Sequence, residues 1–197
     1  MMDNELLQQL KKIQKRDIET RNKLLKEGRL YGQYDQEMQD VHIENANALN
    51  DIIVKHGWPT ISKVGAEGAR LAWLIAQHSI CTPNLQRTFF NSLSEAARNG
   101  DATQKQVALL LDRIRFNEGR PQIYGTIYDW DELGAFTCTV DNPRKVEELR
   151  KAVGLPPFYE ALEEAKKQVK SEGGKPPKSH KKYRKQVEDW AKEVGWR

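Results

Sequence analysis

The spacing of apolar residues along the chain predicts a protein built mainly from helices. The first helix is predicted over residues 3–27, where one stripe at helical spacing is formed by Leu6, Leu10, Ile13 and Leu24. Similar periodicity, with capping and breaking residues at the ends, predicts further helices over about residues 35–56, 65–79, 83–98, 103–117, 142–153, 158–171 and 179–194. Asn142 is expected to cap the helix that follows it.

The pattern changes after residue 120. The segments "PQIYGTIYD" and "AFTCTV" are rich in β-branched and aromatic residues and flank the turn "WDELG", which predicts a two-stranded hairpin over residues 121–129 and 135–140. Neither an internal repeat nor a βαβ alternation is found. The predicted fold is therefore mainly α: a compact helical domain with one small β-hairpin and a C-terminal amphipathic helix.

A segment typical of linkers, "SEGGKPPKS", precedes the last predicted helix. That helix has an apolar stripe to bury, formed by Tyr183, Val187, Trp190 and Val194. We therefore predict a helical domain over residues 1–171, with the hairpin at about 121–140. Residues 172–197 are predicted to form a linker and a basic helix that docks on the same domain.

The net charge of +4 is unevenly distributed. Residues 166–197 hold 11 Lys or Arg and 4 Asp or Glu, a net charge of +7, and the remainder carries −3. A basic tail can bind nucleic acid, but such sites interleave aromatic side chains with the basic ones. Here the aromatic residues of the last helix lie on its apolar side, which favours a docked helix with a solvated basic face.

No apolar run approaches the roughly 18 residues of a membrane span, and the N-terminal segment has no apolar core typical of a signal peptide. Cys81 and Cys138 lie far apart, without the spacing of a metal site. We expect a reduced, cytoplasmic protein that is not bound to a membrane.

Polar residues interrupt the apolar faces of several predicted helices. In "LAWLIAQHSI", residues 71–80, Gln77 and His78 end a strongly apolar run, and His78 shares a face with leucines. In "VALLLDRIRF", residues 107–116, Asp112 and Arg113 follow five apolar residues. Asp17 and Arg21 fall on the stripe of the first helix, and the stripe of the second includes Asn45.

Buried polar groups are costly unless they are paired, so each intrusion needs a partner. Separate structural pairs, such as a core histidine held by a carboxylate or an isolated ion pair, would satisfy them one at a time. Because four helices carry such groups, we favour the interpretation that they share one polar pocket.

The segment "EGRPQIYGT" adds hydrogen-bonding groups to this set. Alternation along the predicted strand places Gln122, Tyr124 and Thr126 on one face, which could be either a ligand-binding face or a solvated one. Gly125 permits the close approach of a ligand or of another segment.

Five motifs resemble, in sequence and order, those of a widespread bacterial family of about this size, catalogued as a domain of unknown function: "NANALNDIIVKHGWP", "VGAEGARLAWLIAQHSI", "DRIRFNEGRPQIYGT", "VGLPP" and "WAKEVGWR". The resemblance covers most of the chain and implies no established activity. It places at signature positions Asn45, Trp58, Gln77, His78, Asp112, Arg113, Gln122, Tyr124, Gly125 and Thr126. The family pattern has Gln after "YGT", where this chain has Ile127, so no role of that glutamine is carried over.

The hypothesis we favour is a small-molecule enzyme, a hydrolase or transferase. Its substrate would be an anion that bears a phosphate or carboxylate, and nucleotide-like compounds are among the candidates. His78 would be the acid/base, oriented by Asp112 and assisted by Tyr124. The predicted substrate-binding residues are Arg113, Arg21, Asp17, Asn45, Gln77, Gln122 and Thr126.

The alternative is a module that binds an anionic metabolite or a protein partner without catalysis. No phosphate-binding loop, dinucleotide turn, zinc signature or nucleophile elbow is found. His78, Asp112 and a third ligand such as His42 could form a metal site, but their spacings do not select one, and no metal ligand is assigned. The sequence indicates neither a cofactor nor an oligomeric state.

Overall fold

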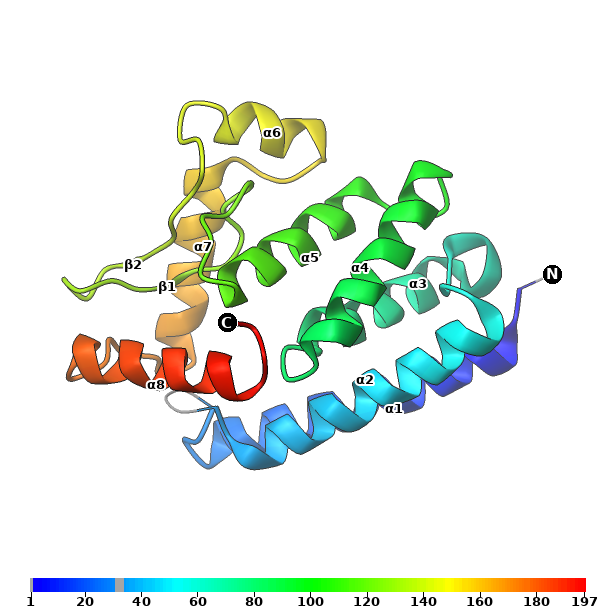
Figure 1. The fold of residues 1–197 in the computed structure, drawn as a ribbon, viewed down its shortest axis with the longest axis horizontal. Helices are drawn as coiled ribbons and strands as arrows, with labels where there is room; N and C mark the ends of the chain where they lie inside the picture. The colour runs from blue at the N-terminus through cyan, green and yellow to red at the C-terminus, as the bar shows by residue number, and fades with distance from the viewer. Residues whose placement is uncertain (1, 31–33) are drawn as a thin grey trace. The chain divides into compact units, whose positions relative to one another are not determined.

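The structure, a computed structural model, describes residues 2–30 and 34–197 and confirms the mainly α prediction (Figure 1). Its elements are α1 (Asn4–Lys26), α2 (Gln36–His56), α3 (Ile61–His78), α4 (Pro83–Arg98), α5 (Gln104–Asn117), β1 (Asp129–Trp130), β2 (Phe136–Thr137), α6 (Val146–Ala152), α7 (Phe158–Ser171) and α8 (His180–Glu193). The chain divides into two compact units, and the boundary falls within α5, between Leu110 and Leu111.

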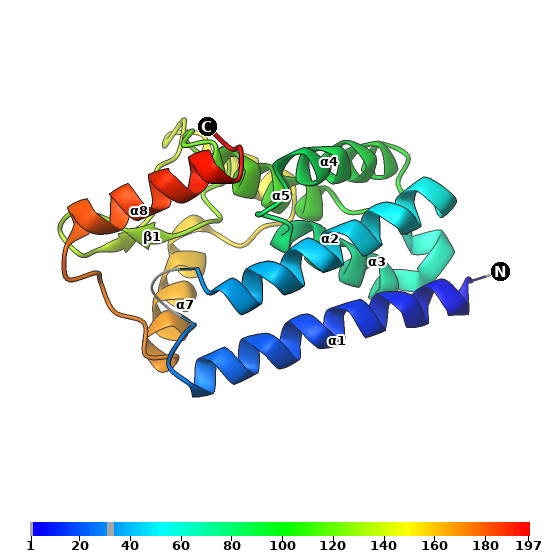
Figure 2. The same cartoon turned by 60° about the horizontal axis from the view of Figure 1, so that its bottom comes forward.

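The first unit is a helical bundle in which α1 and α2 run antiparallel side by side (Figure 2) and both pack on α3. Its core is filled from several helices, as at Leu10, Leu49 and Ile75, which expose at most 1% of their surface. Burying a side chain of this size contributes about 1.5–3 kcal/mol. This apolar core fixes the faces on which the polar residues of the same helices lie.

Local capping explains where two helices of this unit begin. The carboxylate of Asp3 accepts a hydrogen bond from Leu6 N (2.9 Å), and that of Asp35 accepts one from Glu37 N (3.0 Å). These side chains satisfy amides that the first turn of a helix leaves unpaired. The expected start of α2 at Asp35 is therefore explained by its N-cap.

The third helix begins earlier than predicted, at Ile61 rather than at about residue 65. Asp101 anchors this extra turn, since its backbone oxygen accepts from Ile61 N (3.1 Å) and its carboxylate accepts from Ser62 N (2.7 Å). Gly65 (φ +72°) then kinks the helix. No local pattern indicates this start, because Asp101 lies 39 residues beyond Ser62.

The second unit contains the hairpin, which is much shorter than predicted. Only Asp129–Trp130 and Phe136–Thr137 pair as strands, whereas residues 121–128 form a loop whose one strand-like pairing is a bridge between Gln122 and Val140. The expected strand face of Gln122, Tyr124 and Thr126 therefore does not form. Asn142 is also not the cap of α6: it accepts from Arg144 N, and the helix starts at Val146.

Two buried charges of opposite sign replace the missing strand pairing. The carboxylate of Asp112 (0% exposed) accepts hydrogen bonds from backbone N–H groups of the loop. The guanidinium of Arg150 (1% exposed) donates to Tyr124 O (2.7 Å), Gly125 O (3.0 Å) and Pro156 O (2.7 Å). Because amides and carbonyls of the loop are both satisfied by side chains, an irregular conformation is stable here.

The basic helix α8 belongs to this second unit. Ser179 caps it, and the hydroxyl of Tyr183 donates to the carboxylate of Asp129 (2.6 Å). Trp196, just after the helix, is 4% exposed. In the part of the chain that the structure describes, no helix is both long and apolar enough to cross a membrane.

Candidate functional site

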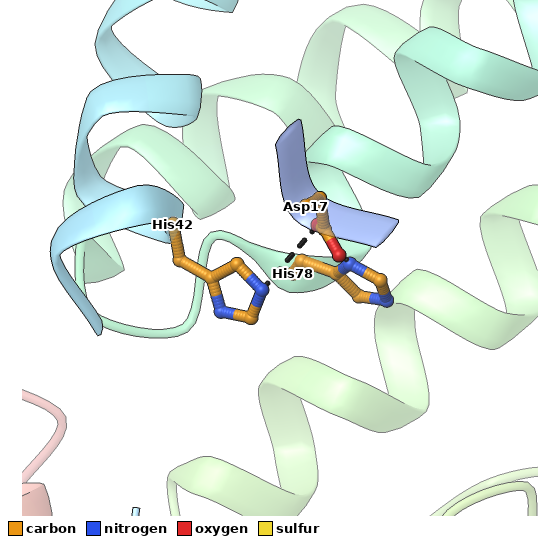
Figure 3. Close-up of side chains that lie close together, drawn as sticks. All are labelled: Asp17, His42 and His78. Atoms are coloured by element: carbon orange, nitrogen blue, oxygen red, sulfur yellow. Dashed lines mark hydrogen bonds and ion pairs between the residues drawn. The ribbon is translucent and has the colours of Figure 1, made fainter. Parts of the chain in front are cut away.

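Three side chains from three helices of the first unit meet around one carboxylate (Figure 3). Asp17 on α1 faces His42 on α2 and His78 on α3. His78 Nδ1 lies 2.7 Å from Asp17 Oδ2, and His42 Nε2 lies 3.4 Å from the same oxygen. We call these three residues the Asp–His–His centre.

The centre is buried on one side and accessible on the other. Asp17 is 2% exposed and His42 is 8% exposed, whereas the side chain of His78 keeps 32% of its surface exposed. Both imidazole rings turn toward the carboxylate, and the second ring nitrogen of His78 points away from it (Figure 3). The ring of His78 is therefore partly open to solvent, while Asp17 remains shielded from water.

The electrostatics of the centre keep Asp17 ionised. Burial alone raises the pKa of a carboxylate, but hydrogen bonds and charge from His42 and His78 outweigh it and hold the pKa of Asp17 well below its usual range. An ionised carboxylate only accepts hydrogen bonds, so Nδ1 of His78 must donate to it. In neutral His78 the proton therefore sits on Nδ1, and Nε2 carries a lone pair.

Tyr34 extends the centre on the side of His42. Its hydroxyl bonds to Nδ1 of His42, and its ring packs against the apolar cluster of Leu24, Met38 and Val41. With Nε2 of His42 facing Asp17, both ring nitrogens of His42 are engaged. A connected polar chain thus runs from Tyr34 through His42 and Asp17 to His78.

The end of α3 that carries His78 is fixed by Gln86 of α4. The fully buried Gln86 Nε2 donates to Ala76 O (2.6 Å) and to Gln77 O (3.2 Å). These carbonyls lie in the last turn of α3, where helices leave acceptors unpaired. Gln86 therefore holds the backbone just before His78, a role that sequence reasoning missed.

Further predicted site residues lie one helical turn away or beside the centre. Asn45 follows His42 by three residues on α2 and is 4% exposed, and its Nδ2 has no hydrogen-bond partner among the described residues. Gln77 precedes His78, is 6% exposed and donates to Leu109 O (3.4 Å). Arg21 follows Asp17 by one turn and is half-buried. These predicted residues, Asp17, Arg21, Asn45, Gln77 and His78, all belong to the first unit, and the structure brings Asp17 and His78 into direct contact.

The remaining predicted residues belong to the second unit, and several hold the loop in place. The carboxylate of Asp112 accepts from Ile123 N (2.8 Å), from Tyr124 N (3.1 Å) and from both N (3.1 Å) and Oγ1 (3.1 Å) of Thr126. Gln122 is 2% exposed, donates to Ile127 O (2.7 Å) and accepts from Thr126 N (2.9 Å). Arg113 is half-buried on α5.

Asp17, rather than Asp112, is the carboxylate that orients His78. The expectation for Asp112 rested on its place after an apolar run, but its oxygens are engaged by the loop. Burial raises the pKa of Asp112, and hydrogen bonds from the loop only partly offset this effect. Sequence reasoning named His42 only as a possible third metal ligand beside His78 and Asp112, and it missed the place of His42 beside Asp17. The only signal for it was its position one turn before Asn45 on the buried face of α2.

The second unit also has a cavity of about 440 Å³, lined by residues that include Trp130, Arg184 and Trp190. Of the predicted site residues only Gln122 lines it, and the hydrogen bonds of Gln122 are used within the loop. Cys138, which also lines the cavity, is a poor nucleophile because burial and the charge of Asp112 raise its pKa to about 11. We therefore place the candidate chemistry at the Asp–His–His centre.

The arrangement of the centre allows two kinds of chemistry. A carboxylate that fixes the tautomer of an imidazole leaves the opposite nitrogen as a proton acceptor. One ligand atom from each of the three side chains also lies within 4.8 Å of the others, so two imidazoles and a carboxylate could hold a metal ion.

Comparison with known proteins supplies a family but no activity. The model of DUF6624, a family of unknown function, matches residues 4–170. No curated protein and no solved structure was found to match the chain.

Proposed function

Because the chain belongs to the DUF6624 family, for which no function is known, we propose its function from the geometry of the Asp–His–His centre. The protein is a small-molecule enzyme that hydrolyses an anionic substrate, or transfers a group from it, with His78 as the acid/base. The observation that carries this proposal is the 2.7 Å contact between His78 Nδ1 and Asp17 Oδ2, with the ring of His78 partly exposed.

In this mechanism, His78 Nε2 removes a proton from a water molecule or from the hydroxyl of an acceptor. The oxygen attacks the phosphoryl or acyl centre of the substrate, and the imidazolium then gives its proton to the leaving group. The ionised carboxylate of Asp17 stabilises the imidazolium and keeps the ring in position. Acid/base catalysis of this kind contributes about 10²–10⁴-fold to a rate. No covalent nucleophile is needed.

His42 and Tyr34 act as positioning residues in this proposal. Asp17 Oδ2 faces His78 and His42 together, so the hydroxyl of Tyr34 fixes the ring that holds the carboxylate from the second side. Without them the buried carboxylate would lose part of its hydrogen bonding, and the ring of His78 would lose its fixed orientation.

The anionic class of the substrate is supported by Arg21. This half-buried guanidinium lies one turn beyond Asp17 on α1, and guanidinium groups bind phosphate and carboxylate through paired hydrogen bonds. Arg113, Tyr124 and Thr126 belong to the second unit, and this proposal is confined to the first unit.

Turnover of a panel of phosphomonoesters, phosphodiesters, nucleotides and carboxylic esters, assayed with a chelator present, tests the proposal. In His78→Gln we expect kcat to fall by about 10²–10⁴-fold with KM nearly unchanged. His56→Gln, which changes a histidine outside the centre, should leave turnover unchanged. Equal turnover by wild type and His78→Gln would contradict the proposal. Saturable binding of these anions without turnover would instead favour a non-catalytic module.

A further inference from the structure

We propose that Asp17, His42 and His78 form a binding site for a divalent transition-metal ion, with Zn²⁺ as the ion that fits the donor set. Two imidazole nitrogens and a carboxylate oxygen, one from each of three helices, approach within 4.8 Å of one another. Three protein ligands of these types are the set that holds zinc in sites with an open position for water or substrate. Imidazole donors also favour transition metals over Mg²⁺ and Ca²⁺.

The distances suit a metal after a small adjustment. Metal–ligand bonds of about 2.0–2.2 Å at tetrahedral angles separate two donor atoms by about 3.4 Å. His42 Nε2 and Asp17 Oδ2 lie 3.4 Å apart, whereas His78 Nδ1 and Asp17 Oδ2 lie 2.7 Å apart, where a proton joins them. An outward movement of the His78 ring by roughly 1 Å or less would open this second distance to the tetrahedral value. The ring has room for this because its side chain is 32% exposed.

The surroundings of the three ligands have the features of a metal site. Metal-binding histidines usually form a hydrogen bond through the ring nitrogen that does not bind the metal, and this bond fixes the tautomer. In His42 that nitrogen is Nδ1, and its hydrogen-bond partner is the hydroxyl of Tyr34. Asp17 and His42 are buried, so two of the three ligands are held rigidly and away from water. Nearby, Gln14 Oε1 and Asn45 Nδ2 are buried without a hydrogen-bond partner among the described residues, one turn from Asp17 and His42.

This inference concerns the same side chains as the proposed function but does not require His78 to be an acid/base. A metal on Nδ1 of His78 leaves the remaining proton on Nε2, and His78 then cannot accept another. Metal and proton therefore compete for the centre. If the proposed function holds, the bound metal inhibits the reaction by occupying the Asp17–His78 contact.

Titration of the untagged chain with Co²⁺, followed through its visible absorption and then by displacement with Zn²⁺, tests this site directly. We expect one ion per chain, and a loss of affinity of about tenfold or more in Asp17→Asn, His42→Gln and His78→Gln. His56→Gln and His180→Gln change the only other histidines and should bind as wild type does. Circular dichroism identifies any variant that has not folded, and the partly exposed His78 provides a variant that tolerates substitution.

The outcomes separate this inference from the proposed function. Absence of a saturable Co²⁺ band up to about 1 mM, the range of weak binding, overturns the metal site whatever the activity. Binding that is unchanged in His78→Gln also overturns it. If turnover occurs in the presence of a chelator and is suppressed by an excess of Zn²⁺, both proposals are supported. Turnover that requires Zn²⁺ supports the metal site and overturns the role of His78 as the base, because the metal-bound water then supplies the attacking oxygen.

Discussion

Nδ1 of His78 lies 2.7 Å from Oδ2 of Asp17, although 61 residues separate the two along the chain. The contact joins a nearly fully enclosed carboxylate to a ring that is one-third exposed. A charge in the interior is stable only when it is paired and hydrogen-bonded. The two histidines therefore have a structural role, because their contacts with the carboxylate make the burial of Asp17 tolerable.

Replacement of Asp17 by asparagine should destabilise the protein. The amide side chain has nearly the same shape, but the change removes the charge that pairs with His42 and His78 and turns an acceptor into a donor facing other donors. Breaking a buried pair by removing one partner costs about 3–5 kcal/mol. Urea unfolding at neutral pH, followed by circular dichroism, measures the change in the free energy of unfolding.

Asp51→Asn is the matched control for this measurement, because Asp51 is exposed on α2. Exposed substitutions of this kind change stability by less than about 0.5 kcal/mol. A loss in Asp17→Asn that is no larger than that in Asp51→Asn would show that the carboxylate is not held by the two rings.

The contribution of Asp17 to stability should vanish in acid. Its pKa in the folded state lies below the usual range, since His42 and His78 outweigh the effect of burial. A carboxylate with a depressed folded pKa stabilises the protein above its unfolded pKa of about 3.9, and this contribution is lost as the pH falls through the folded pKa. The groups that face it are His42, with Tyr34 behind it, and His78.

We therefore expect the wild type to be more stable than Asp17→Asn at neutral pH, and the difference to narrow as the pH falls below about 4. Urea unfolding curves at a series of pH values measure both proteins. If the difference in the free energy of unfolding between the two proteins grew toward low pH, the pKa of Asp17 would not be lowered in the folded state.

The helices and the polar interior of the first unit were predictable from the sequence because both depend on local periodicity. Asp17 and Asn45 fall on apolar stripes, and a residue on the buried stripe of a helix must lie inside. The sequence did not predict which of these buried polar side chains contact one another. His78 pairs with Asp17 and not with Asp112, because helix packing selects the partner and spacing along the chain does not encode it.

The hairpin shows the opposite limit, where a local preference was overridden. The residues of "PQIYGTIYD" favour strand pairing, yet in the loop the amides of Ile123, Tyr124 and Thr126 bond to the carboxylate of Asp112. A charged acceptor that is buried on another element competes successfully with strand pairing. No pattern within the segment indicates that a buried carboxylate on α5 will bind its amides.

Replacement of Asp112 by asparagine should therefore loosen the loop in particular. Only one of the two oxygens remains as an acceptor, and the new amide group faces backbone N–H donors. We expect a loss of about 2–3 kcal/mol in the free energy of unfolding, since buried donors lose their partner. Faster hydrogen exchange at the amides of residues 123, 124 and 126 would locate the effect. Glu132→Gln, which changes an exposed carboxylate in the hairpin turn, is the control and should change neither quantity.

At Gly125, two effects of adding a side chain can be measured separately: the unfavourable backbone conformation and the steric overlap with neighbouring side chains. This glycine has φ +64°, and a Cβ atom there would lie 2.6 Å from Phe158 Cε2 and 2.8 Å from Val140 Cγ1. The close approach expected at this glycine is thus made by other segments of the chain. Gly154 has a similar φ of +73° with nothing within 4 Å of a Cβ atom. Gly154→Ala therefore measures the backbone conformation alone, about 1 kcal/mol.

Gly125→Ala adds the steric overlap to the backbone effect, so it should lose more stability than Gly154→Ala by about 1–3 kcal/mol. The overlap is not relieved cheaply, because Phe158 also lies with its ring 5.7 Å from the guanidinium of the buried Arg150, which holds the loop carbonyls. Urea unfolding of the two variants side by side measures the difference. Equal losses would mean that the ring of Phe158 moves aside freely, and that the packing around Arg150 does not fix the loop as we infer.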